Sequence, residues 1–189
     1  MFYFTHEELK ELAISIGALT IAFSLVIGGW SGFLGALFPS FLAVVTGFFL
    51  HEMGHKFVAQ SYGLFSEFRM SLQGLIIAVI TAIFGFLIAA PGAVVISGYS
   101  TREQTGKIAL AGPLTNVVIS ILFLPLIFVG GVIGFTAFIV SYINAFLALF
   151  NLIPFEPLDG EKIFHWSFFH YLGIGIVSLT LFVTLIIVR

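Results

Sequence analysis

Six long apolar runs dominate the chain, and only short polar stretches separate them. They fall at residues 12–38, 40–62, 72–97, 108–129, 133–154 and 168–188. A helix that crosses a bilayer needs about 20 apolar residues, so every run is long enough to be a candidate. The pattern predicts an all-α polytopic membrane protein with five to six transmembrane helices.

The run at 72–97 changes character halfway along. It begins with a helical pattern and then reaches Pro91 and Gly92, a pair that breaks a helix. The residues that follow are typical of a short strand: Ala93, Val94, Val95, Ile96 and Ser97. Non-helical backbone at membrane depth is tolerated only where protein or a water-filled cavity covers it. We therefore expect either a sixth crossing or a membrane-embedded re-entrant segment that contains a strand.

The basic residues favour re-entry, because positive charge concentrates in cytoplasmic loops. If all six runs cross and the N-terminus is cytoplasmic, the basic loop residues divide evenly between the two sides. If 72–97 returns to the side that it left, only Arg189 lies outside. The basic residues that then lie inside are Lys10, Arg69, Arg102, Lys107 and Lys162.

The first part of the chain carries two local signals. Thr5 followed by Glu8 is a capping box, which predicts the start of a short interfacial helix that leads into the first span. The segment lacks the basic start of a signal peptide. Farther along, Gly28, Gly32 and Ala36 recur every four residues, a spacing that lets two membrane helices approach closely.

Composition supports a membrane protein and narrows the chemistry. The 189 residues are 60% hydrophobic and 8% charged, and the mean hydropathy is +1.18. This length suits a single membrane-embedded domain over 1–189. A net charge of −2 gives no reason to expect a nucleic-acid partner. Because there is no Cys, disulfides and thiolate sites are excluded, and His, Asp or Glu must hold any metal.

His51, Glu52 and His55 form an H-E-x-x-H motif inside the second run. Two His four positions apart lie on one face of a helix and can reach one metal ion. The Glu after the first His is placed to take a proton from the attacking water. Ionisable groups at membrane depth are costly and usually functional. The motif predicts metal-dependent hydrolysis within a membrane, with Glu52 as the catalytic residue.

A third metal ligand is needed, because catalytic zinc sites use three protein ligands and leave a fourth position for water. The chain contains one Asp, Asp159, which follows the fifth run in an N-x-x-P-x-x-P-L-D-G sequence. Pro154 and Pro157 end the helix there, and Gly160 allows a tight turn. In the re-entrant topology the second and fifth runs both travel toward the cytoplasmic face, so Asp159 comes near the His pair. We expect one zinc per chain.

Three motifs in this order resemble those of the site-2 proteases, which are intramembrane zinc metalloproteases that cut membrane-anchored substrates. They are H-E-x-x-H, then Gly112-Pro113-Leu-Thr-Asn116, then the N-x-x-P-x-x-P-L-D-G that starts at Asn151. The resemblance covers residues 40–165, which would form the catalytic core. The PDZ or CBS domains of many relatives are not seen in this chain.

The resemblance implies a role for each matching residue. His51, His55 and Asp159 would bind zinc, and Glu52 would be the general base. Asn116 and Asn151 would orient the substrate or stabilise the oxyanion, and residues 72–97 would be the family's membrane-associated, β-containing segment. From the Pro-Gly break we expect in addition that the strand at 93–97 holds an unwound substrate by strand addition. The implied partners are the lipid bilayer and a membrane-anchored protein substrate, cut by regulated intramembrane proteolysis. The implied location is the cell membrane of a prokaryote, with the active site nearer the cytoplasmic face.

Two other classes of protein remain open at this point. A catalytically silent zinc-binding membrane protein would need the His pair but no base, and the presence of Glu52 argues against it. A metal transporter would repeat acidic or His positions along a path across the membrane. Here the expected ligands lie at one depth, which argues against transport.

Overall fold

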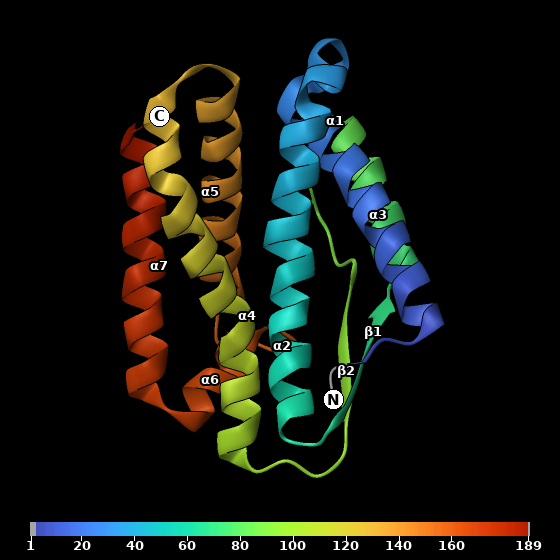
Figure 1. Cartoon of the computed structure of the whole chain (residues 1–189), viewed down its shortest axis with the longest axis vertical. Coiled ribbons are helices and arrows are strands. Elements are labelled where there is room, and N and C mark those ends of the chain that lie inside the picture. The colour runs from blue at the N-terminus through green and yellow to red at the C-terminus, as the bar shows by residue number, and fades with distance from the viewer. Residues whose placement is uncertain (1–2, 189) are drawn as a thin grey trace.

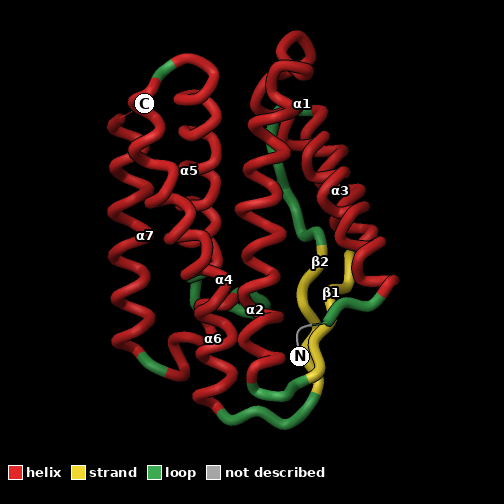
Figure 2. The backbone as a smooth tube through the Cα atoms, viewed as in Figure 1, coloured by secondary structure: helices red, strands yellow, loops and turns green. Residues whose placement is uncertain are grey.

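The computed structural model describes residues 3–188 and consists mainly of long helices that run side by side (Figure 1). The helices are α1 (His6–Val44), α2 (Leu50–Ser61), α3 (Leu72–Ile83), α4 (Arg102–Phe123), α5 (Gly131–Asn151), α6 (Asp159–Trp166) and α7 (Phe168–Val188). A π-helical turn (Val45–Phe49) joins α1 to α2, and a 3-10 turn (Leu124–Val129) extends α4. The strands are β1 (Phe65–Met70) and β2 (Gly92–Ser97), which lie at the lower end in Figure 2.

The helix α1 starts as the sequence predicts. The Thr5 side chain accepts a hydrogen bond from the Glu8 backbone N–H, and the Glu8 side chain accepts one from the Thr5 backbone. These bonds satisfy two N–H groups that a helix terminus otherwise leaves free. The predicted capping box is therefore confirmed, and it begins the first long helix directly.

The chain reverses within α1, at Gly29. This residue has φ 59° and ψ −168°, a combination that is almost restricted to glycine. Figure 1 shows the part of α1 after this turn running back beside the first part. Phe23 and Ile27 of the first arm pack against a cluster that includes Ala43 of the second arm. The helix α1 is therefore a hairpin of two arms.

The predicted boundary between the first two apolar runs, at residues 38–40, is wrong. Pro39 lies inside the second arm, which continues through it without a break in helical dihedral angles. Neighbouring helices can satisfy the backbone groups that a proline frees within a membrane bundle. Gly28 packs against the second arm close to the turn, since a Cβ there would lie 3.0 Å from the Ala36 Cβ. Gly28 and Ala36 thus allow the close approach of the two arms, whereas a Cβ on Gly32 would have no neighbour within 4 Å.

The run at 72–97 makes an excursion away from the sheet and back to it. The strands β1 and β2 pair antiparallel, with Met70 opposite Gly92 and Phe65 opposite Ser97. Between them, α3 has 12 residues, which is fewer than the roughly 20 that a crossing needs. The returning chain passes so close to α3 that a Cβ on Gly74 would clash with the Ala90 carbonyl. The expected strand at 93–97 is present and includes Gly92 as well.

Within the described residues, four helical segments are long and apolar enough to cross a membrane. They are His6–Ser61, Arg102–Val129, Gly131–Asn151 and Phe168–Val188. The first is 56 residues long and contains the Gly29 reversal. The expectation of a helical membrane protein is thereby confirmed at the level of these four segments, with the two-stranded sheet as its β component.

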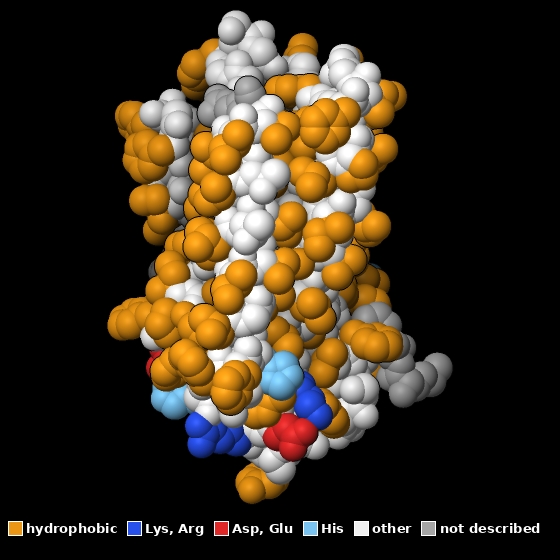
Figure 3. All heavy atoms as spheres, turned by 90° about the vertical axis from the view of Figure 1, so that its left-hand side faces the viewer, with side chains coloured by type: hydrophobic (Ala, Val, Ile, Leu, Met, Phe, Trp, Pro, Cys, Tyr) orange, Lys and Arg blue, Asp and Glu red, His pale blue; other side chains and the backbone are white. Residues whose placement is uncertain are grey.

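The charged residues that the structure describes gather at one end of the molecule. No Asp, Glu, Lys or Arg occurs in residues 12–51, 70–101, 108–155 or 163–188. The charged segments left between these stretches are the start of α1, the end of α2, β1, the start of α4 and the start of α6. These lie at the lower end in Figure 1, and the face in Figure 3 is apolar above and charged below. This distribution is typical of a protein embedded in lipid with one polar end.

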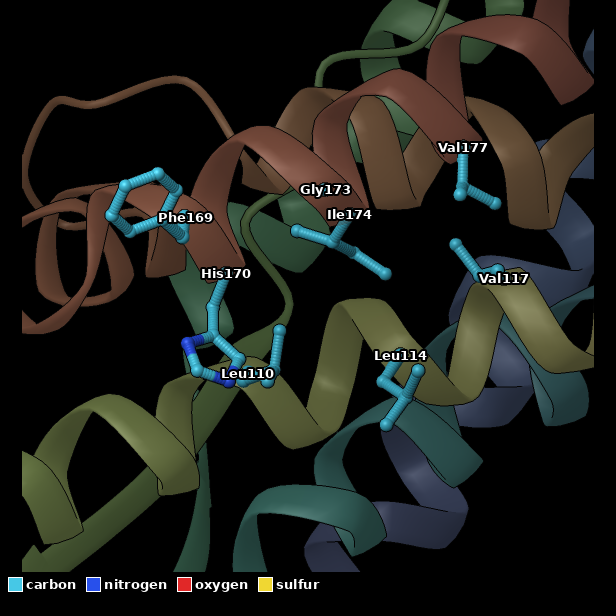
Figure 4. Close-up of a pocket in the computed structure, with 8 residues that line it drawn as sticks. All are labelled: Leu110, Leu114, Val117, Phe169, His170, Gly173, Ile174 and Val177. Carbon is cyan, nitrogen blue, oxygen red and sulfur yellow. The ribbon is translucent and has the colours of Figure 1, made fainter.

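The central helix of the bundle is α4, which packs against α2, α5 and α6. Buried serines join it to α5, since Ser141 Oγ donates to the Ser120 carbonyl at 2.9 Å. On its outer side a groove of about 410 Å³ separates α4 from α7 (Figure 4). Apolar side chains line most of this groove, and none of its residues belongs to the H-E-x-x-H or L-D-G motifs. The polar chemistry is therefore on the inner side of α4.

Candidate metal centre

The side chains of His51, His55 and Asp159 meet on the inner side of α4. The two Nε2 atoms lie 3.0 Å apart, and Asp159 Oδ2 lies 3.3 Å from His51 Nε2 and 3.2 Å from His55 Nε2. All three residues are at most 9% exposed. Among the described residues, these three form a group of His and carboxylate side chains able to hold a metal ion.

The π-helical turn and α2 place the two His on one face, as the i, i+4 spacing predicts. A turn of π-helix within an α-helix is uncommon and often marks a functional site. Here it spans Val45–Phe49 and ends two residues before His51. Close packing of α4 holds the imidazoles in place, because a Cβ on Gly54 would lie 2.9 Å from the Ala111 carbonyl. A Cβ on Gly112 would clash with both imidazole rings.

Asp159 reaches the His pair from the first turn of α6. The segment between α5 and α6 contains both prolines, so no helix connects Asn151 to Leu158. Gly160 then lies so close to the Leu152 carbonyl that a side chain would not fit. The turn that the sequence predicts at this glycine is therefore a close backbone contact, and it directs the Asp159 carboxylate toward α2.

The geometry fits a tetrahedral zinc ion. Two ligand atoms that each lie about 2.0–2.1 Å from such an ion are roughly 3.3–3.4 Å apart. The measured separations of 3.0, 3.2 and 3.3 Å are close to this spacing. Three ligands of this kind leave the fourth position for water, as in catalytic zinc sites.

The electrostatics of Asp159 also suit a metal ligand. Burial acts to raise the pKa of its carboxyl group, but when the imidazoles are protonated the charge on His55 and the hydrogen bonds from both rings outweigh burial. The net effect lowers the pKa below its ordinary value. The site thus favours the ionised carboxylate, which is the form that binds a cation.

Both imidazoles present Nε2 to the centre, because Nδ1 has an acceptor on the other side. His55 Nδ1 lies 2.8 Å from the Ile108 carbonyl oxygen, and His51 Nδ1 contacts Asn116 Oδ1. A carbonyl oxygen only accepts, so each Nδ1 carries a hydrogen, and in the neutral imidazole that binds a metal the lone pair is then on Nε2. Partners of this kind fix the tautomer of metal-binding histidines.

Glu52 lies beside this centre but points toward the sheet. Its Oε2 accepts a hydrogen bond of 2.9 Å from the Val94 backbone N–H of β2. The side chain is mostly buried, at 8% exposure for the residue. This contact joins the H-E-x-x-H helix to the predicted strand and leaves the other carboxylate oxygen available.

Asn116 is fully buried, and its whole amide group is engaged. Nδ2 donates to the Gly47 carbonyl and to Asn144 Oδ1, both at 2.9 Å, while Oδ1 accepts from His51. Donation to a substrate or an oxyanion would require one of these bonds to open. The structure thus joins Asn116 to the metal centre through His51, and its expected role toward substrate stays a prediction.

Asn151 lies in the last turn of α5, where its Nδ2 donates to the Leu147 carbonyl at 3.0 Å. The hydrogen bonds of the described residues do not join it to the His pair or to Asp159. Its role toward substrate also stays a prediction.

Sequence reasoning missed Asn144 and Thr46, which continue the hydrogen bonds beyond Asn116. Asn144 Nδ2 donates to Thr46 Oγ1 at 3.0 Å and to the Val140 carbonyl at 2.9 Å. The Asn144 amide could have indicated an interior hydrogen bond, because polar side chains within membrane helices usually face the interior of the bundle and bond to other helices. The partner of that amide could not be read from one sequence.

Comparison with known proteins places this chain in a family. It is 40% identical over 182 residues to a protein of Methanocaldococcus jannaschii that is provisionally named a zinc metalloprotease, covering 93% of each chain. A second protein of that organism, named a zinc metalloprotease, is 29% identical over 161 residues, which are 82% of this chain and 42% of its own length. A protein of Synechocystis, also provisionally named a zinc metalloprotease, is 31% identical over 166 residues, which are 82% of this chain and 37% of its own length.

No family model matches the chain, and no solved structure matches it. The extent of the first similarity is decisive, because it spans nearly the whole of both proteins. The chain belongs to this family of zinc metalloproteases. Together with the cluster of His51, His55 and Asp159, this membership confirms the expected zinc cofactor.

Proposed function

We propose that the protein is an intramembrane zinc endopeptidase of the site-2 protease type, which hydrolyses peptide bonds in or near transmembrane segments of membrane-anchored substrates. The observation that carries this proposal is the meeting of His51, His55 and Asp159 beside Glu52, within a bundle of apolar helices. A soluble metalloprotease would have no need to place such a centre between helices of membrane length.

The residues of the site have complementary roles in this reaction. Zinc held by His51, His55 and Asp159 would polarise the scissile carbonyl and make the attacking water more acidic. Glu52 accepts the proton of that water and then gives it to the leaving amine. Asn116 keeps His51 in the tautomer that binds through Nε2.

The sheet offers one open edge for an unwound substrate. Phe68 and Val94 lie opposite each other in the sheet, and each directs its backbone N–H outward. On the β1 side that N–H donates to Glu8 Oε1 at 2.9 Å, and the Met70 N–H donates to Glu11 Oε2 at 2.8 Å. Carboxylates of α1 thus occupy the outer edge of β1, which leaves the outer edge of β2 for strand addition.

Glu52 lies at that open edge. A substrate strand that pairs with β2 would bring a carbonyl to the Val94 N–H, the donor that Glu52 uses in this structure. Substrate binding would then release the base close to the bond to be cut. A transmembrane helix hides its carbonyls in its own hydrogen bonds, so this pairing would also stabilise the unwound form.

The proposed topology has five crossings. The two arms of α1, with α2 completing the second, supply two crossings, and the segments containing α4, α5 and α7 supply one each, while residues 72–97 re-enter. His55 lies six residues from the end of α2 at Ser61, which is about 9 Å along the helix axis. Among the described residues the basic side chains lie at this end, so the positive-inside rule favours a site nearer the cytoplasmic face, here of a prokaryotic cell membrane.

The proposal is tested with purified protein and a model transmembrane substrate. Glu52→Gln keeps the shape of the side chain but removes the base, so zinc should stay bound while cleavage falls by about 10²–10⁴-fold. Equal cleavage by both forms, or no cleavage by the zinc-loaded wild type, would end the proposal. The second of these results would favour a silent zinc-binding protein. Zinc uptake by sealed vesicles that contain either form would indicate a transporter.

A further inference from the structure

A chain of hydrogen-bonded, buried polar side chains runs from the π-helical turn, through α5 and α4, to the metal centre. Its members are Thr46 in the π-helical turn, Asn144 on α5, Asn116 on α4 and His51 on α2. Thr46 is 7% exposed, His51 is 5% exposed and the two Asn are 0% exposed. Four separate helical elements therefore meet through these side chains, in a region otherwise filled with apolar groups.

Backbone carbonyls fix the direction of every hydrogen bond in this chain. The Leu42 carbonyl accepts from Thr46 Oγ1 at 2.8 Å, so the Thr46 oxygen is left to accept from Asn144 Nδ2 at 3.0 Å. The Val140 carbonyl also accepts from Asn144 Nδ2, at 2.9 Å. A carbonyl cannot donate, so the amide group of Asn144 has one possible orientation.

The same reasoning fixes the orientation of the Asn116 amide group. The Gly47 carbonyl accepts from its Nδ2 at 2.9 Å, and Asn144 Oδ1 accepts from the same nitrogen at 2.9 Å. Asn116 Oδ1 therefore faces His51 and requires a hydrogen on Nδ1. With that hydrogen on Nδ1, the lone pair of His51 is on Nε2, which is the atom that points toward Asp159.

The two metal-binding His differ in how they are held. His55 depends on the Ile108 main-chain carbonyl, at 2.8 Å. His51 depends on side chains, of which the nearest is Asn116 and the next is Asn144. A side chain can be replaced, so the orientation of His51 is open to a mutational test that His55 does not permit.

We propose that Asn144 is a positioning residue for the metal centre, which acts through Asn116 to hold His51 in the tautomer and orientation that bind zinc through Nε2. Asn144 itself does not contact a ligand atom of the centre. The inference concerns zinc binding, so it stands apart from the proposal that the substrate is a membrane-spanning protein.

The test measures zinc affinity by competition with a chromophoric chelator, using the purified full chain in detergent. Removing a partner one step beyond a metal ligand typically costs 10–100-fold in metal affinity. Asn144→Leu keeps the branched shape of the side chain but removes the amide, and we expect zinc affinity to fall by about 10-fold. The absorption spectrum of the Co²⁺-loaded protein should shift as well, because the ligand field at His51 changes.

Ser141→Ala is the matched control. Ser141 lies on α5 three residues before Asn144, is fully buried, and donates to α4 at Ser120. Removal of the Ser141 hydroxyl deletes a hydrogen bond between the same two helices. It leaves the hydrogen bonds from Asn144 through Asn116 to His51 intact. We expect its zinc affinity to stay within about 2-fold of wild type, because loss of packing alone should not alter a ligand. An equal loss in Ser141→Ala would overturn the proposal.

Coupling supplies a second criterion, since residues that act through one another are not additive. In an Asn116→Leu background, Asn144→Leu should cause no further loss of zinc affinity. A full second loss would show that Asn144 acts by another route, and it would overturn the proposal.

Thr46→Val keeps the shape of the side chain and serves if Asn144→Leu fails to fold. It removes Thr46 Oγ1, the oxygen that accepts a hydrogen bond from Asn144 Nδ2. Zinc affinity should therefore fall, but by less than in Asn144→Leu. Wild-type zinc affinity and an unchanged Co²⁺ spectrum in Thr46→Val, or in a folded Asn144→Leu, would contradict the proposal.

Discussion

The Lys56 ammonium lies 2.9 Å from the Glu8 carboxylate, and both side chains are completely buried. Lys56 also donates to the Ser66 carbonyl at 2.7 Å, and its Nζ lies 5.1 Å from the centre of the Phe4 ring. The pair therefore ties the first turn of α1 to the H-E-x-x-H helix and to β1.

Glu8→Ala should destabilise the fold strongly, because it leaves a buried ammonium without its counter-charge. The expected loss in free energy of unfolding is about 3–5 kcal/mol. It should appear as a lower thermal midpoint in detergent. Glu7→Ala changes the exposed neighbour on the same turn and should leave the midpoint nearly unchanged. Similar midpoints for the two variants would mean that the Glu8–Lys56 pair does not stabilise the fold.

Asp159→Ala should abolish zinc retention, since two imidazoles alone make an incomplete site. Metal analysis of purified protein should give one zinc per chain for wild type and almost none for the variant. Glu156→Ala removes an acid three residues away that is exposed and outside the cluster, so it should retain zinc. Full zinc content in Asp159→Ala would refute the assigned ligand set.

Gly112→Ala should disturb the metal centre although it adds a single methyl group. That group would clash with both imidazole rings, and neither ring can move without leaving its Nδ1 partner. We expect a fall in zinc affinity of about 10-fold or more, as for the loss of an orienting partner. Gly35→Ala adds the same group where no atom lies within 4 Å, and zinc affinity there should match wild type. Equal affinities in the two variants would show that α4 does not fix the rings.

Val94→Pro should impair cleavage and spare zinc binding. Proline is tolerated in an edge strand where its N–H would face outward, and the Val94 N–H faces Glu52. The loss of one main-chain donor, worth about 1–1.5 kcal/mol, should reduce cleavage of a transmembrane substrate about 10-fold. Val94→Ala keeps the N–H and serves as the control. Wild-type cleavage by Val94→Pro would rule out pairing of a substrate strand at this position.

The sequence was sufficient to select the three side chains that meet at the candidate centre, because His51 and His55 follow helical spacing and Asp159 is the one Asp in the chain. It also located the strand after Pro91 and Gly92, where the helical pattern fails. The first pattern consists of residue types that are rare in apolar surroundings, and the second is local. Both can be recognised without knowledge of the tertiary structure.

Features that depend on distant contacts could not be obtained in this way. The turn in the first long helix was expected near Pro39 but occurs at Gly29, because backbone conformation there depends on packing between the two arms. The partners of Lys56 and Asn144 come from segments 48 residues and 28 residues away in the chain. Periodicity gives the buried face of a helix, but it does not say which helix covers that face.

The confinement of charge to one end of the bundle has a consequence for the barrier function of the bilayer. Residues 12–51 and 108–155 contain no carboxylate, ammonium or guanidinium group, so these stretches offer no charged side chain to a permeating ion. Under the proposed function, a peptide bond would be cut near the polar end, and the apolar half of the bundle would remain in place as part of the membrane barrier.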